Sequence, residues 1–140
     1  MILHISEAAN LAIHAMSYLA NRDETGEPIP TVEIAGSMNI SANHLSKVLQ
    51  RLGRTGLVKS IRGPRGGFRL AREPEDITLL DIYEAIDGHL PPRGHCLMGT
   101  PSCGLSTCIF GGLIEDVHQQ VNSHFSATTL AHLIEAQPRP

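Results

Sequence analysis

The sequence contains no tryptophan, and aromatic residues make up only 4% of its 140 residues. A core for this chain must therefore come from aliphatic side chains, which suits packed helices. No apolar run approaches the roughly 20 residues that a membrane span requires. Residues 1–7 lack the basic segment that begins a secretory signal and carry an early acid. These absences predict a cytoplasmic protein without a membrane segment, the size of one ordinary domain.

Cysteine is also scarce, and its three residues lie together as Cys96, Cys103 and Cys108. An odd number in a reducing compartment argues against a disulfide framework and favours metal or redox chemistry. The pattern C-x6-C-x4-C lacks the closely spaced pairs of a zinc motif, whereas three thiolates in one glycine-containing loop suit the larger iron–sulfur cluster. Three free thiols are the alternative. No acid–base constellation accompanies the cysteines, so we predict that the protein is not an enzyme.

A cluster normally has four protein ligands, so one donor is missing from this loop. Nearby candidates are His95 and His89. Glu7 and His14, on a predicted N-terminal helix, are candidates that would act across a dimer interface.

Acidic residues are absent from a central stretch of the chain. Residues 44–72 contain no Asp or Glu but hold eight of the eleven basic residues, although the net charge of the chain is −3. Such segregation predicts one positive face for a polyanion, and nucleic acid is the expected ligand. The alternative is a solvated helix face.

Periodicity and capping residues predict a mostly α-helical chain with a small β-wing. Helices are expected over residues 6–20, from a Thr31 cap, and from a Ser41 cap to Gly53 and Gly56. Residues 38–40 would be the turn of a helix-turn-helix. Strands over residues 57–61 and 68–70, joined by the turn 62–67, would form the wing. Further helices are predicted over 79–87, capped by Thr78 and closed by Gly88, and over 109–126. A short segment from Thr129 to Ala136 ends the chain.

In a helix-turn-helix, the first residues of the second helix lie nearest the base edges. Asn43 is therefore expected to bond adenine, and His44 or Lys47 to reach guanine or phosphate. Ser41 suits a phosphate, an N-cap or both, and Arg51 is expected to contact phosphate or to be an exposed charge. Arginine and glycine at a wing tip allow close approach to DNA, so the interface also includes Arg62, Gly63, Arg65 and Gly66.

These features together resemble the IscR/NsrR family of bacterial winged-helix regulators. The resemblance covers nearly the whole chain and depends mainly on the Arg62-Gly63-Pro64-Arg65-Gly66-Gly67 wing and the three-cysteine loop. It implies a homodimer in which the helix 109–126 crosses its partner. It also implies a 2Fe-2S or 4Fe-4S cluster in the loop, completed by an acidic residue or a histidine. The acidic position of the family falls here on Asn10, and His14 follows one turn later.

We therefore expect a transcriptional regulator with three parts. Residues 1–88 would form the winged helix-turn-helix, residues 89–108 the cluster-binding loop, and residues 109–140 the dimerisation helix and C-terminal segment. A cluster would modulate binding to a double-stranded operator, in response to redox state, nitric oxide or cluster supply. The alternatives are a winged-helix regulator whose cysteines act as a zinc or thiol redox sensor and, more remotely, a small iron–sulfur carrier.

Overall fold

The computed structural model describes residues 4–90, 96 and 103–137. Helix α1 (Glu7–Asn21) is the centre of the described fold, and helices α3 (Ala42–Arg54), α4 (Leu79–Asp87) and α6 (Leu130–Ala136) pack around it. Its inner face is made of small buried alanines, Ala9, Ala12 and Ala15, together with Met16. Alanine at these positions lets several helices approach one central helix closely.

The helix-turn-helix consists of α2 (Thr31–Met38) and α3, as the sequence predicts. Asn39 adopts the left-handed conformation, with φ of 54°, and ends α2. The Ile40 backbone N–H donates to the Ala35 carbonyl at 3.1 Å, and the Ile40 side chain packs against the core. The turn is thus fixed both by backbone geometry and by an apolar anchor.

Two strands, β1 (Val58–Ile61) and β2 (Gly67–Leu70), form the antiparallel wing, with Val58 opposite Leu70 and Ile61 opposite Gly67. Helix α4 follows the wing after a 3₁₀ turn, Pro74–Asp76. Its start at Thr78 has the predicted cap, because Thr78 and Asp81 bond each other's backbone N–H groups in a capping box. The winged-helix prediction is confirmed.

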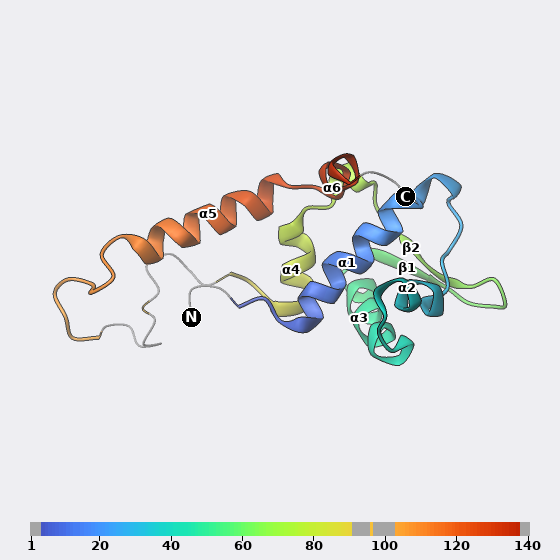
Figure 1. Ribbon diagram of the computed structural model, residues 1–140, viewed down its shortest axis with the longest axis horizontal. Helices are drawn as coiled ribbons and strands as arrows, with labels where there is room; N and C mark the ends of the chain where they lie inside the picture. The colour runs from blue at the N-terminus through green and yellow to red at the C-terminus, as the bar shows by residue number, and fades with distance from the viewer. Residues whose placement is uncertain (1–3, 91–95, 97–102, 138–140) are drawn as a thin grey trace.

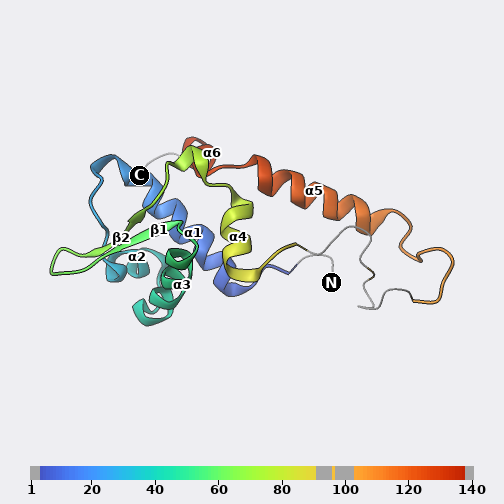
Figure 2. The same cartoon turned by 180° about the vertical axis from the view of Figure 1, so that it is seen from behind.

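Helix α5 (Leu113–Ala127) extends away from this body, and both ribbon views show it at the end opposite the wing (Figures 1 and 2). The chain then returns. An isolated bridge between Thr78 and Thr129 joins the starts of α4 and α6, and Leu130 is fully buried beside α1.

Three predicted boundaries are wrong. The cap of α2 is Pro30, whose ψ is already extended, so Thr31 is the first helical residue and its hydroxyl makes no cap bond. Helix α3 continues through Gly53 to Arg54, and only Gly56, with φ of +77°, redirects the chain. Helix α5 begins at Leu113 rather than Ile109, after two glycines of which Gly111 has φ of +60°.

Candidate nucleic-acid interface and cysteine loop

The N-terminal turn of α3 is exposed and capped by a side chain. The Ser41 hydroxyl accepts from the His44 backbone N–H at 3.3 Å. Asn43, His44 and Lys47 are all exposed on the first turns of the helix, while Leu45 is fully buried beneath them. A helix whose inner side is held by the core and whose first residues face solvent has the form needed to enter a major groove.

The tip of the wing is exposed from Ile61 to Arg65. Gly63 has φ of +114°, with open space where a Cβ would lie. At Gly66 the reason for glycine is different, because a Cβ there would lie 2.2 Å from the Ile61 carbonyl oxygen. A narrow hairpin with two exposed arginines, Arg62 and Arg65, is the result.

The wing is joined to the segment that precedes α2, a contact that sequence analysis missed. The backbones of Ile29 and Phe68 exchange two hydrogen bonds, of 2.8 and 2.9 Å. Gly67 permits this approach, since a Cβ there would lie 2.1 Å from the Ile29 carbonyl oxygen. The only signal in the sequence is an isoleucine between two prolines, which is too short to read as a strand.

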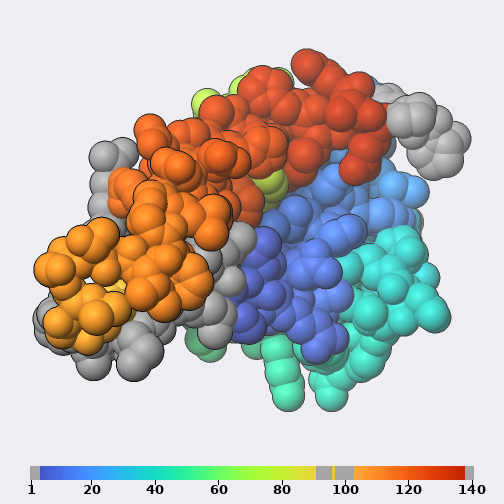
Figure 3. Space-filling view, turned by 60° about the vertical axis from the view of Figure 1, so that its left-hand side comes forward, coloured from blue at the N-terminus to red at the C-terminus, as the bar shows by residue number. Residues whose placement is uncertain are grey.

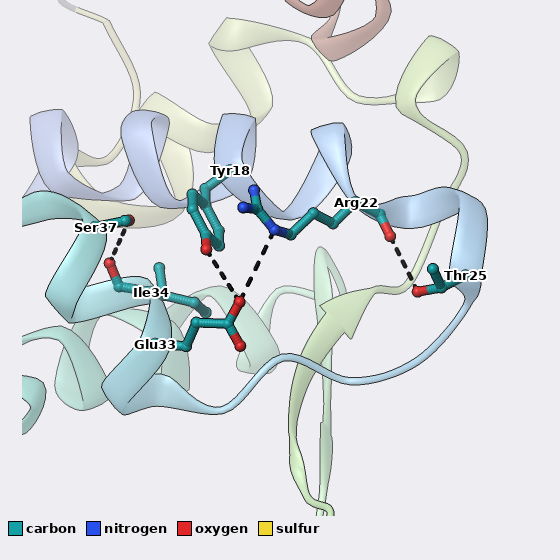
Figure 4. A network of polar contacts seen from close by, with 6 residues as sticks. All are labelled: Tyr18, Arg22, Thr25, Glu33, Ile34 and Ser37. Atoms are coloured by element: carbon teal, nitrogen blue, oxygen red, sulfur yellow. Dashed lines mark hydrogen bonds and ion pairs between the residues drawn. The ribbon is translucent and has the colours of Figure 1, made fainter. Parts of the chain in front are cut away.

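A second contact fixes the helix-turn-helix against α1. The Glu33 carboxylate on α2 accepts a 3.2 Å hydrogen bond from the Tyr18 hydroxyl and lies 3.9 Å from the Arg22 guanidinium (Figure 4). The Arg22 guanidinium also lies over the Tyr18 ring, 4.0 Å from its centroid. Burial raises the pKa of Tyr18, and Glu33 raises it further against the opposing charge of Arg22. The tyrosine therefore remains a hydrogen-bond donor at neutral pH.

The eight basic residues of the stretch 44–72 fall into two groups. Three of these basic side chains contact other parts of the described chain. Arg51 donates to the Ile86 carbonyl at the end of α4, Arg69 to the Gly26 carbonyl at 3.3 Å, and Arg72 lines a cavity of about 230 Å³ that includes Asp81. Arg51 and Arg72 are nevertheless exposed, and Arg69 is partly exposed. The other five are exposed on α3 or the wing: Lys47, Arg54, Lys59, Arg62 and Arg65.

The cysteine loop is only partly described, since residues 91–95, which include His95, and 97–102 lie outside the described residues. All three cysteines have free thiols. Cys103 and Cys108 are exposed, and Cys96 is partly buried. Within the described residues, no three His, Cys, Asp or Glu side chains lie close enough to hold a metal ion. The thiol donors suit an iron–sulfur cluster, but the described part of a single chain does not bring them together at one site.

The candidate ligands on α1 share its outer face. Glu7, Asn10 and His14 are all exposed, and a broad surface of α1 is visible between the loop-α5 end and the helix-turn-helix (Figure 3). The His14 Nδ1 lies 2.8 Å from the Asn10 carbonyl oxygen. His89, the other candidate, has its Nδ1 3.1 Å from the Glu84 carboxylate.

Helix α5 has no buried residue along its 15 residues. Leu113 is 53% exposed, and Ile114, Val117 and Val121 are only partly covered. Near its C-terminal end, Phe125 packs edge-on against Tyr83 of α4, with ring centroids 5.7 Å apart. The helix is thus attached to the body at one end, and at the other end its apolar stripe is left uncovered by the described residues of the chain.

No helix in the described part of the chain combines the length and the apolar character needed to cross a bilayer.

Comparison with known proteins gives a consistent result. The family model of Rrf2, described as an iron-dependent transcriptional regulator, matches residues 5–136. An HTH-type transcriptional regulator of Aquifex aeolicus is 35% identical over 138 residues, covering 96% of this chain and 93% of that protein. The regulator IscR of Klebsiella pneumoniae is 29% identical over 136 residues, covering 96% and 82%.

Two solved structures share the fold along nearly the whole chain. The structure of CymR, the global cysteine regulator of B. subtilis, has a TM-score of 0.82 and 28% identity, covering 97% of this chain and 99% of CymR. The structure of T. potens IscR has a TM-score of 0.74 and 27% identity, covering 99% and 93%. These relatives are transcriptional regulators rather than enzymes, in agreement with the prediction from the sequence.

Proposed function

Because the chain belongs to the Rrf2 family of transcriptional regulators, we propose that it reads an operator as a homodimer and that its cysteine loop modulates this binding through an iron–sulfur cluster. The observation that carries the DNA-reading part is the exposed, Ser41-capped start of α3 on a core-anchored helix, together with the basic wing tip. Both lie away from α5 (Figure 1). The winged-helix fold favours this function over an iron–sulfur carrier.

The first turns of α3 would enter the major groove. Asn43 is suited to bond adenine N6 and N7, and His44 and Lys47 to bond guanine or phosphate. The Ser41 hydroxyl and the first backbone N–H groups of α3 suit a phosphate. These contacts would read sequence and set the position of the protein on the duplex.

The wing would contact DNA beside this groove. Arg62 and Arg65 are exposed and long enough to follow a minor groove or its phosphates. Gly63, in open space, and Gly66, packed against the hairpin, keep the tip narrow enough for its backbone to approach DNA. The wing would therefore add affinity that depends on the shape of the DNA.

The apolar stripe of α5 is the proposed dimer interface. Leu113, Ile114, Val117 and Val121 recur at helical spacing, and none is buried within one chain. Burial of such side chains against the same helix of a second copy contributes about 1.5–3 kcal/mol for each one fully covered. Two winged helices joined in this way would fit two half-sites of an operator.

Cys96, Cys103 and Cys108 would hold the cluster, because thiolates are its usual ligands and all three are free. When bound, the cluster would supply iron that reacts with oxidants or nitric oxide. The residues of the chain supply ligands and the connection to α4. His95 and Glu7 are further candidate ligands.

His14 is the most suitable fourth donor on α1. When its Nδ1–H donates to the Asn10 carbonyl 2.8 Å away, Nε2 retains the lone pair that a metal requires. Histidines that bind metal commonly donate their other ring N–H to a carbonyl in this way. The exposed face of α1 leaves His14 accessible to the loop of a second copy.

The proposed parts of the chain are the winged helix-turn-helix (residues 1–88), the cluster-binding loop (89–108) and the dimerisation segment (109–140). Helix α6 packs in the same core as α1, so the last segment also completes the DNA-binding domain. A cytoplasmic location fits DNA binding and reduced thiols.

A second function has its own observation. Cys103 and Cys108 are exposed free thiols, and no group of three metal donors is assembled in the described part of one chain. Exposed thiols can react with oxidants directly, so a thiol redox sensor on the same winged helix is the alternative. A zinc sensor, with the same cysteines as ligands, belongs to this alternative as well.

Anaerobic purification, followed by assays of iron, acid-labile sulfide and visible absorption, distinguishes an iron–sulfur sensor from a thiol or zinc sensor. Iron and sulfide in wild type, and their loss when the three cysteines are replaced by serine, are expected. Zinc, or no metal after attempted reconstitution, would favour the second function.

DNA reading is tested by selecting a duplex from a random-sequence library with the purified protein. Lys47→Gln should weaken binding to the selected duplex and lower the slope of log K against log salt by about 1 for each protomer. Glu75→Gln, at an exposed position outside the interface, is the matched control and should leave the slope unchanged. Failure of wild type to select any duplex would refute the DNA-reading part.

A further inference from the structure

The C-terminal end of α4 is a junction of three segments. The Arg51 guanidinium, on the last turn of α3, donates to the Ile86 carbonyl. One residue later, the Asp87 carboxylate accepts from the Ser6 backbone N–H at 2.9 Å and from the Ser6 hydroxyl at 2.5 Å. The Ser6 hydroxyl in turn caps α1 by accepting from the Ala9 N–H at 3.0 Å. The recognition helix and the start of α1 are thus joined to adjacent residues of α4, Ile86 and Asp87.

The bond of Arg51 has a clear physical basis. The last carbonyls of a helix have no partner within the helix and carry partial negative charge, so a guanidinium there is doubly favourable. Arg51 also lies eight residues after Asn43, about 12 Å along the helix axis. It therefore lies away from the base-reading end, with a partner inside the protein.

The same junction adjoins the proposed sensing residues. Gly88, with φ of +79°, turns the chain out of α4 directly into the loop 89–108. Ser6 immediately precedes Glu7, and His14 is two turns further along α1. A displacement of the loop or of α1 therefore acts first on Gly88 and Asp87, which directly follow the Ile86 that Arg51 bonds.

We propose that Arg51 is a positioning residue: it holds α3 against the end of α4 and transmits a change in the cysteine loop to the DNA-reading residues. This inference rests on the proposed function and assigns the regulation of the same site. It changes the expected role of Arg51, which would set the direction of the helix instead of contacting phosphate.

The length of the recognition helix converts a small rotation at one end into a displacement of the other end. Its 13 residues form a rod about 20 Å long. Asn43 lies about 12 Å from Arg51 along this rod, so a rotation of about 5° at Arg51 would move Asn43 by about 1 Å. This displacement exceeds the tolerance of a base-edge hydrogen bond. A small change at the end of α4 is therefore enough to alter the fit to a half-site.

The chain offers a specific way to change the loop, because its three cysteines all lie there. N-Ethylmaleimide applied to the reduced, metal-free protein therefore modifies only the loop. The affinity for the selected duplex is measured before and after this treatment in wild type, Arg51→Gln and Arg54→Gln. Arg54 is the matched control: like Arg51 it is exposed on the last turn of α3, but it has no such contact with α4 among the described residues.

For wild type and Arg54→Gln we expect the treatment to change the dissociation constant by about fivefold or more. For Arg51→Gln the change should fall below twofold, and the salt slope should equal that of wild type. A full response in Arg51→Gln, or a salt slope lowered by about 1 for each protomer as in Lys47→Gln, would overturn the inference.

Hydrogen exchange of the DNA-free protein separates failure of this inference from failure of the proposed function. The treatment should change exchange in α3 of wild type and leave α3 of Arg51→Gln unaffected. If both proteins change equally, Arg51 does not transmit the signal, whatever the DNA result. If wild type α3 changes but the protein selects no duplex, the DNA-reading proposal fails while the role of Arg51 stands. If wild type α3 does not change at all, no transmission exists and the inference is refuted.

Discussion

Replacing Gly67 with alanine should separate the wing from the rest of the DNA-binding domain. A Cβ at this position would lie 2.1 Å from the Ile29 carbonyl oxygen, 2.3 Å from its carbon and 2.7 Å from the Pro30 nitrogen. All three are backbone atoms, so no side-chain rotation relieves the overlap. The two segments must move apart by about 1 Å, since contacts under 3.0 Å essentially never occur.

The magnitude follows from what this displacement breaks. The 2.8 and 2.9 Å hydrogen bonds between Ile29 and Phe68 would both be lost, at about 1 kcal/mol each. The Gly67 backbone, with φ of +156°, adds strain of about 1–3 kcal/mol for a residue with a Cβ. We therefore expect a loss of about 4 kcal/mol in the free energy of unfolding, and a fall in Tm of roughly 10–15 °C for a chain of this size.

Urea and thermal unfolding followed by far-ultraviolet circular dichroism measure this loss, because the chain has no tryptophan for fluorescence. Gly26→Ala is the matched control: Gly26 has φ of +64°, but a Cβ added there would meet nothing within 4 Å. It should cost only the left-handed backbone strain, about 1 kcal/mol. If Gly67→Ala is no less stable than Gly26→Ala, close approach of the two backbones does not explain this glycine.

Three further substitutions test other contacts. Ser41→Ala should lower the free energy of unfolding by about 1 kcal/mol through loss of the α3 cap, and an unchanged urea midpoint would contradict this. Burial, and then the charge of Asp87, raise the pKa of Tyr83, so folding holds its proton more tightly than the unfolded chain does. Stability should therefore be complete below about pH 10 and fall above it, less steeply in Tyr83→Phe; equal slopes would refute the assignment. Glu33→Gln weakens a pair whose side chains are about half exposed, so urea unfolding should show a loss below about 1 kcal/mol; a loss above about 2 kcal/mol would give this contact a larger structural role.

The sequence predicted the elements whose boundaries are set by local chemistry. The predicted caps Ser6, Ser41 and Thr78 each cap a helix in the structure, because a hydroxyl that accepts from a backbone N–H acts within three residues. Glycine was a less reliable marker of helix ends, because tertiary packing can keep a glycine inside a helix. Gly53 lies inside α3 although a terminator was predicted there, since the packing of the helix outweighs the low helix propensity of one residue.

What the sequence by itself determined is the order of helices, the winged helix-turn-helix and the collection of all cysteines in one loop, because these follow from periodicity, capping and residue type. Tertiary structure alone decided which basic residues bond other segments of the chain and that Ile29 joins the wing. It also decided that Arg51 bonds the end of α4, 35 residues away. Partners so distant in sequence leave no local pattern, since their contact exists only after the helices have packed.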